Sequence, residues 1–266
     1  MKLRVDHETR YIYDAPVVYG LQQLRLRPKD TRGQKVLDWE VAIEGGETQL
    51  SYEDHNGNSV DLVGIEPGRT ETSIRCVGLI ENTEGDGVLG EHKGFLPLWH
   101  YRRSSDLTKA GEGVRKLVAS LDDSDKGDVG TGHRLSEAIL EAVGYEGGNT
   151  HAGTTAEEAI EIGTGVCQDH AHIFCSAARL MGLPARYVSG YLMMNDRVEQ
   201  DASHAWAEAF FEGIGWVGFD ISNGYSPDER YIRVATGIDF REAAPISGMR
   251  MGGSGEGVLV NLRVEQ

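Results

Sequence analysis

The feature that most constrains the fold is a change in hydrophobic periodicity along the chain. Residues 1 to about 95 alternate apolar and polar side chains, the pattern of half-buried β-strands. Turn-forming segments such as "DHNGN" and "EPGR" separate these strands. The predicted strands are "LRVDHETRYIYD", "GLQQLRLRP", "VLDWEVAIEG", "TQLSYEDHNGNSVDLVGIE" and "TETSIRCVGLIEN". Short strands with this punctuation predict an antiparallel β-sandwich or barrel.

Beyond Pro97 the apolar residues recur at helical spacing. Helices are predicted in "DLTKAGEGVRKLVASL", "HRLSEAILEAVGY" and "TTAEEAIEIG", the last with Thr154 or Thr155 as its cap. The segment "DDSDKGDVGTG" between the first two is predicted to be a solvated loop. A fourth helix begins at Cys167 and ends at Gly182.

Strands are predicted again after this helix. They are "ARYVSGYLMM", "HAWAEAFFE" and "GWVGFDIS", followed by a loop-rich tail and a closing strand, "GVLVNLRVEQ". The order predicts an α+β protein with two domains, a β-domain over residues 1–95 and a second domain over residues 96–266.

Composition narrows the possible partners. The 266 residues include 26 Lys and Arg against 42 Asp and Glu, a formal net charge of -16. This balance argues against nucleic acid as a partner, because such binding depends on cationic contacts. There is neither a run of about 18 apolar residues nor the apolar core of a signal peptide, so we expect no membrane association and a cytoplasmic location.

The three cysteines fall in different settings. They are odd in number and lack CxxC spacing, so neither a disulfide framework nor a structural zinc site is expected. Cys76 lies in a predicted strand and Cys175 on the apolar stripe of its helix, which suits packing. Cys167 starts that helix, where free N–H groups and the helix dipole favour a thiolate and could stabilise an oxyanion. A redox pair of Cys167 and Cys175 is disfavoured, because they lie roughly 12 Å apart along the helix.

A thiolate nucleophile needs a base and a group that orients the base. His204 begins one predicted strand, and Asp220 ends the next. If these strands form a hairpin, alternation counted from the turn places both side chains at a common edge of the sheet. The spacing therefore suggests a relay in which Cys167 attacks, His204 moves the proton and Asp220 holds the ring.

The other histidines give no metal signal. His170 and His172 are separated by about 200° around a helix, so they cannot share a face. We expect them to be core residues or to support the site. The rest lie in strands or loops without ligand-like spacing: His7, His55, His92, His100, His133 and His151. No metal site is predicted.

The segments "GVCQDHAHIFCSAARLMGLPARYVSGYL", "ASHAWAEAFF" and "GWVGFDISNG" closely resemble the catalytic segments of the transglutaminase-like superfamily. The match is to its bacterial branch, often described as candidate cysteine proteases. The segments "HETRYIYDAPVVYGLQQLRLRP" and "DHNGNSV" resemble the N-terminal β-domain of that branch. The resemblance covers nearly the whole chain and is weakest from about 105 to 150. It implies a papain-like core in which a catalytic helix packs on an antiparallel sheet.

Carried over to this sequence, the resemblance assigns Cys167 as nucleophile, His204 as base and Asp220 as orienting acid. Gln168 is a candidate oxyanion donor or a polar residue of the helix start. A second donor is expected upstream of the cysteine, with Tyr145, Asn149 and His151 as candidates. Trp206 shares a strand face with His204, so it either shapes the wall of the site or simply packs.

The expected activity is amide chemistry through a thioester. A peptidase or amidase acting on a peptide or protein is favoured over a protein-glutamine transglutaminase, because water is the default acceptor at an exposed site. A non-catalytic interaction module is a further alternative, against which the intact triad argues. No cofactor is expected, and no calcium-binding loop of the DxDxDG type is present. The loops 145–163 and 193–203 set the substrate, which the sequence does not identify, and the oligomeric state stays open.

Overall fold

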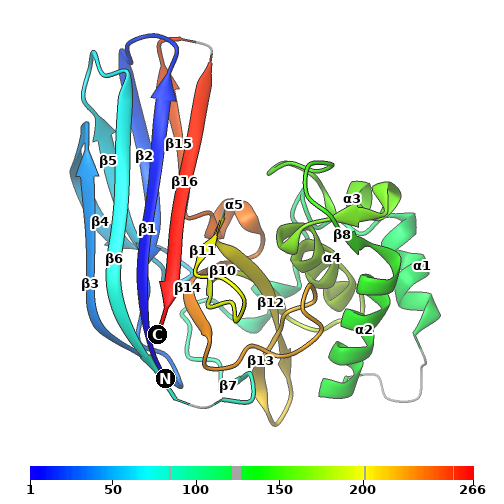
Figure 1. Ribbon diagram of the computed structural model, residues 1–266. Coiled ribbons are helices and arrows are strands. Elements are labelled where there is room, and N and C mark those ends of the chain that lie inside the picture. The colour runs from blue at the N-terminus through cyan, green and yellow to red at the C-terminus, as the bar shows by residue number, and fades with distance from the viewer. Residues whose placement is uncertain (84, 122–126, 201, 254) are drawn as a thin grey trace.

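The computed structural model describes residues 1–83, 85–121, 127–200, 202–253 and 255–266. Its α+β fold combines a tall β-sandwich with a mixed core whose longer helices lie on the side away from the sandwich (Figure 1). The two chain ends lie together at one end of the sandwich (Figure 1). The predicted fold class is therefore correct, with a sandwich rather than a barrel at the N-terminus.

The sandwich consists of two antiparallel sheets among the described residues. One has the order β11-β16-β1-β6-β3, formed by Glu199–Gln200, Glu256–Glu265, Lys2–Tyr13, Glu71–Asn82 and Gln34–Glu44. The other has the order β15-β2-β5-β4, formed by Ile246–Met251, Tyr19–Arg27, Ser59–Ile65 and Gly46–Glu53. Alternate side chains of β2, β5 and β6 fill the space between the sheets: Leu24, Leu26, Val63, Ile74 and Cys76. Cys76 is thus a packing residue, as expected.

The core is built on a third antiparallel sheet. Its order is β14-β10-β12-β13-β7, formed by Tyr231–Gly237, Ala185–Leu192, His204–Phe211, Gly215–Phe219 and Val88–Gly90. The helices are α1 (Glu112–Ser120), α2 (Val129–Ala142), α3 (Ala156–Ile162), α4 (Cys167–Leu180) and α5 (Phe240–Ala243), with a 3₁₀ helix η1 (Leu98–Arg102). A short parallel pair, β8 (Gly144–Tyr145) and β9 (Thr164–Gly165), precedes α4.

Strand β10 is buried along its whole length, because both of its faces are covered. Ala185 and Tyr187 pack with the helices. Tyr191 packs instead against the sandwich, in a cluster that includes Leu3 of β1 and Val264 of β16. This cluster joins the sandwich to the core sheet and fixes the sheet that carries the candidate site.

Strands on each side of the predicted boundary between residues 95 and 96 pair with strands on the other side. β7 precedes the boundary and pairs with β13 of the core. β15 and β16 follow it and pair with β2 and β1 of the sandwich. The C-terminal strands β15 and β16 therefore complete the sandwich. The division into domains 1–95 and 96–266 stays a prediction.

Two local expectations were wrong. The tail after Ser222 was expected to be loop-rich, yet it contains β14 and β15, whose pairing with β10 and β2 is not visible in local sequence. The predicted loop "DDSDKGDVGTG" includes the first turn of α2, because the Asp128 side chain accepts a hydrogen bond from the Thr131 N–H and starts the helix at Val129. Residues 122–126 of that segment lie outside the described residues. Among the described helices, none is long and apolar enough to cross a bilayer.

Candidate active site

Cys167 is the first residue of α4 and is partly exposed. Helix geometry leaves the first N–H groups of α4 without intrahelical partners, since the first such bond runs from His170 N–H to the Val166 carbonyl. The Asp169 carboxylate accepts hydrogen bonds from the Val166 N–H at 2.8 Å and from the Thr150 hydroxyl at 2.7 Å. The start of the catalytic helix is therefore fixed from both sides, with donors directed at the Cys167 end.

The β8–β9 pair brings an upstream loop to this helix start. Tyr145 is opposite Gly165, and the Glu146 N–H donates to the Gly165 carbonyl at 2.9 Å. Gly165 cannot carry a side chain here, because a Cβ atom would lie 2.8 Å from Cβ of Asp169. The close approach of backbone and Asp169 side chain therefore explains the glycine two residues before Cys167.

His204 and Asp220 meet across the β12–β13 hairpin. His204 Nε2 lies 2.6 Å from Asp220 Oδ2, and both side chains are buried. In the register of the hairpin, Ala207 is opposite Phe219, so His204 and Asp220 fall on the same face. Since Nε2 is held by Asp220, Nδ1 is the nitrogen left for the Cys167 thiol, with which the His204 ring interacts.

His204 and Asp220 each shift the pKa of the other. Burial alone would lower the pKa of His204, but hydrogen bonds to Asp220 and Cys167 outweigh it and raise that pKa to about 10. Burial would likewise raise the pKa of Asp220, yet hydrogen bonds from His204, Tyr231 and Asn223 lower it. His204 is therefore placed to exchange a proton with the Cys167 side chain while Asp220 holds its ring.

Two residues that the sequence did not single out complete the Asp220 site. The Tyr231 hydroxyl donates to Asp220 Oδ2 at 2.6 Å, and Asn223 Nδ2 donates to the same oxygen at 2.7 Å. Asn223 follows Asp220 by three residues in the segment "DISNG". Tyr231 belongs to β14, a strand that the sequence analysis missed. The missing strand is why no sequence signal pointed to Tyr231.

His170 and His172 are fully buried, and they bond to different parts of the protein. His170 Nε2 lies 3.0 Å from the Val143 carbonyl, and its Nδ1 lies 2.9 Å from the Ser222 hydroxyl. His172 Nε2 accepts the Phe240 N–H at 3.1 Å. Burial lowers the pKa of both, that of His172 to about 3, so both rings are neutral. His170 thus ties the turn after Asp220 to α4.

The other residues that the sequence singled out differ in their contacts. Gln168 Nε2 donates to the Ala152 carbonyl at 3.3 Å, so this side chain holds the upstream loop. Trp206 is buried, with its ring 6.3 Å from that of His204, and forms the packing behind the histidine. Tyr145 is exposed over part of its surface. Partial burial, together with the charges of Cys167 and Asp220, raises the pKa of its hydroxyl.

The other two upstream candidates lie further along the loop. Asn149 Nδ2 donates to the Thr164 hydroxyl at 3.0 Å, and His151 Nδ1 accepts the Gly153 N–H at 3.0 Å. Both therefore have local partners within the loop. Of the three upstream candidates, Tyr145 is the one that pairs with Gly165, two residues before Cys167.

Cys175 contrasts with Cys167 on the same helix. Its side chain is fully buried, and burial raises the pKa of its thiol to about 11. It packs in the cluster between the helices and the sheet. One thiol of α4 thus faces a base and a helix start, while the other fills the core behind it.

Comparisons with known proteins agree with this architecture. Residues 115–221, which contain Cys167, His204 and Asp220, match the model of the transglutaminase-like superfamily. Residues 3–81 match the bacterial transglutaminase-like N-terminal region. Uncharacterized proteins of Mycobacterium leprae and Mycobacterium tuberculosis are each 27% identical, over 94% and 93% of this chain and 94% and 87% of theirs.

A solved structure shows the same fold. It is that of a protein from Cytophaga hutchinsonii described as a candidate cysteine protease, with a TM-score of 0.74 and 20% identity. The match covers 100% of this chain and 98% of that one. The chain therefore contains a transglutaminase-like core over residues 115–221 and a bacterial transglutaminase-like N-terminal region over residues 3–81.

Proposed function

We propose that this protein is a cysteine-dependent enzyme that acts on amide bonds through a thioester, and that hydrolysis is its main reaction. The observation that carries the proposal is His204, held by Asp220 at 2.6 Å and interacting with the Cys167 side chain at the start of α4. The transglutaminase-like core supports a cysteine-dependent enzyme, and the geometry supports the roles of the three residues.

The reaction follows from these positions. The Cys167 thiolate attacks the amide carbonyl, and the negative oxygen is stabilised by the free N–H groups at the start of α4. His204 gives its proton to the leaving nitrogen as the C–N bond breaks, which leaves a thioester on Cys167. Water then attacks the thioester, His204 takes the proton of the water, and the carboxylic acid and free thiol are released. Asp220 keeps the ring oriented throughout.

Hydrolysis is favoured over transfer to an amine because Cys167 is partly exposed. Water at about 55 M competes with any amine unless the site excludes it. A protein-glutamine transglutaminase is the alternative, since the same thioester can react with a primary amine. A peptide or protein is the proposed substrate, and the cytoplasm is the proposed location of the reaction.

The test is to incubate the purified chain with a mixture of proteins, with and without a fluorescent primary amine, and to analyse the products by mass spectrometry. Cleaved peptide bonds or glutamines converted to glutamate indicate hydrolysis. Covalent incorporation of the amine indicates transfer. Each product must disappear in Cys167→Ala, which separates this activity from a contaminating protease.

A non-catalytic interaction module predicts a different result. No covalent product would form with any acceptor, and no acyl group would be found on Cys167 after rapid acid quenching. That outcome, in a folded protein with an accessible Cys167, would overturn the proposed enzyme.

A further inference from the structure

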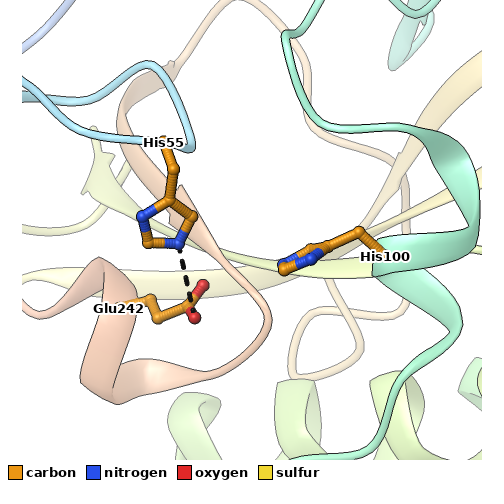
Figure 2. Close-up of side chains that lie close together, drawn as sticks. All are labelled: His55, His100 and Glu242. Carbon is orange, nitrogen blue, oxygen red and sulfur yellow. Dashed lines mark ion pairs between the residues drawn. The ribbon is translucent and has the colours of Figure 1, made fainter.

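Three residues far apart in the sequence come together where the sandwich meets the core. His55 lies in the "DHNGN" turn between β4 and β5, His100 in η1 and Glu242 in α5. One potential ligand atom from each lies within 4.8 Å of the other two. Figure 2 shows that both imidazole rings and the carboxylate point toward one another from three separate elements. None of them belongs to the candidate active site.

The spacing of these atoms suits a small metal ion. Zinc binds histidine nitrogen and carboxylate oxygen at about 2.0–2.2 Å, which places neighbouring ligands of a tetrahedron about 3.3–3.5 Å apart. His55 Nε2 and Glu242 Oε1 are 3.5 Å apart. The ring centroids of His55 and His100 are 6.2 Å apart at 69°. Two histidines and a glutamate also form a known zinc ligand set, in which water takes the fourth position.

His100 has a polar atom without a protein partner. Its Nε2 is buried and has no hydrogen-bond partner among the described residues. A histidine ring nitrogen without a protein partner is available to bind a metal ion. An ion pair between His55 and Glu242 alone would leave this nitrogen unused.

The carboxylate is oriented as metal-binding carboxylates are. Glu242 Oε2 accepts hydrogen bonds from Asn56 Nδ2 at 2.8 Å and from the Ile238 N–H at 3.0 Å. Its other oxygen, Oε1, is the one directed at His55. Supporting hydrogen bonds of this kind fix ligand geometry and strengthen metal binding. Two cations near the cluster have partners elsewhere: Arg179 donates to backbone carbonyls, and Arg241 pairs with Asp106.

The turn that carries His55 is held rigidly against the core. Asp54 Oδ1 accepts the N–H groups of Asn56 and Asn58, which fixes the turn itself. Asn58 then bonds through its side chain to both the N–H and the carbonyl of Thr236 in β14. His55 is therefore placed by backbone and side-chain bonds that do not depend on an ion.

From this arrangement we propose that His55, His100 and Glu242 bind one divalent transition-metal ion of the Zn²⁺ type, which fastens the "DHNGN" turn of the sandwich to η1 and α5 of the core. No sequence pattern predicts this site, because His55 and Glu242 are separated by most of the chain. The ion adds a link between the two parts of the molecule, independently of the proposed amide chemistry.

The test uses the full chain, stripped of metal with a chelator, and Zn²⁺ as the probe. Because thiolates also bind zinc, the measurements are made in Cys167→Ala as well as wild type. The ligand variants are His55→Ala and Glu242→Gln, and the matched control is His151→Ala, another exposed histidine. Affinity and stoichiometry are measured by competition with a chromophoric chelator. His55 is 51% exposed and Asp54 holds its turn, so its removal leaves the fold intact, as circular dichroism will check.

In the Cys167→Ala background we expect one Zn²⁺ per chain at this site. Adding the control substitution His151→Ala to this background should leave that stoichiometry unchanged. Affinity is expected to fall at least about tenfold when His55→Ala or Glu242→Gln is added. Zinc should also raise the thermal midpoint of Cys167→Ala, and this rise should vanish with His55→Ala. Co²⁺ should give a ligand-field spectrum without a thiolate charge-transfer band. No binding in Cys167→Ala, or equal affinity in the ligand variants and the control, would overturn the proposal.

Discussion

His204 Nε2 and Asp220 Oδ2 are joined by a 2.6 Å hydrogen bond in a buried environment that also contains the Tyr231 hydroxyl. Against the effect of burial, the interactions of His204 with Asp220 and Cys167 raise its pKa to about 10 in the folded protein, compared with about 6.5 in an unfolded chain. The folded state therefore binds the His204 proton more tightly than the unfolded state. Its contribution to stability is fully present below about pH 6.5 and is lost as the pH rises through about 10.

Asp220→Asn is expected to remove most of this effect. The free energy of unfolding, measured with urea, should fall by about 1–3 kcal/mol near pH 6, because a hydrogen bond to a charged group is weakened. The difference from wild type should shrink as the pH rises through about 10, above which His204 is neutral in both proteins. It should also shrink in acid as Asp220 itself takes up a proton, since the lowered pKa of Asp220 stabilises the fold only above that range. A difference independent of pH would show that the pair is not charged.

The same substitution tests orientation in catalysis. With Asp220→Asn we expect the rate of any Cys167-dependent reaction to fall at least about 100-fold, because the ring loses the acceptor that fixes its tautomer. The circular dichroism spectrum should stay that of wild type. An unchanged rate would remove Asp220 from the mechanism.

Tyr231→Phe removes one hydrogen bond to Asp220 without changing the size of the ring. We expect a loss of about 1.5–3 kcal/mol in the free energy of unfolding near neutral pH, because the buried carboxylate loses a donor. The pH dependence of stability in acid should also move upward, since the pKa of Asp220 is less depressed. Tyr52→Phe is the control, as the hydroxyl of Tyr52 receives a solvent-exposed bond from Gln23 and should change stability little. Equal effects of the two substitutions would contradict the role of Tyr231.

Gly165→Ala tests the placement of Cys167. The new Cβ would lie 2.8 Å from Cβ of Asp169, so either β9 or the start of α4 must move. We expect a loss of activity greater than the loss of stability, because the nucleophile and the oxyanion donors move together. Gly147→Ala is the control, since no atom lies within 4 Å of its Cβ position and its φ is not in the left-handed region. Full activity in Gly165→Ala would show that this approach does not position the site.

The sequence predicted those parts of the site that local patterns encode. The glycine before Cys167, the helix periodicity after it and the alternation in the β12–β13 hairpin are all short-range features. They were enough to bring Cys167, His204 and Asp220 into one hypothesis. The start of α3 is another local feature: the sequence left Thr154 and Thr155 open as its cap, and the structure has Thr155, with Glu158 completing a capping box.

Long-range pairing could not be predicted in the same way. β14 reads as part of a loop-rich tail, because its residues gain their partners from β10, far upstream. Tyr231 was missed with it. The meeting of His55, His100 and Glu242 depends on how the sandwich docks on the core, which no spacing along the chain expresses.

The most direct test of the central claim is site-resolved alkylation by iodoacetamide across pH, in wild type and in His204→Ala. The account predicts that Cys167 is alkylated rapidly at about pH 6, since the thiolate is the reactive form and His204 stabilises it. Cys76 and Cys175 should stay unreactive, because burial raises their pKa to about 12 and about 11. In His204→Ala the reaction of Cys167 should require a pH near about 8.5, that of an ordinary thiol. Equal reactivity of Cys167 in the two proteins at about pH 6, or none in wild type, would contradict the account.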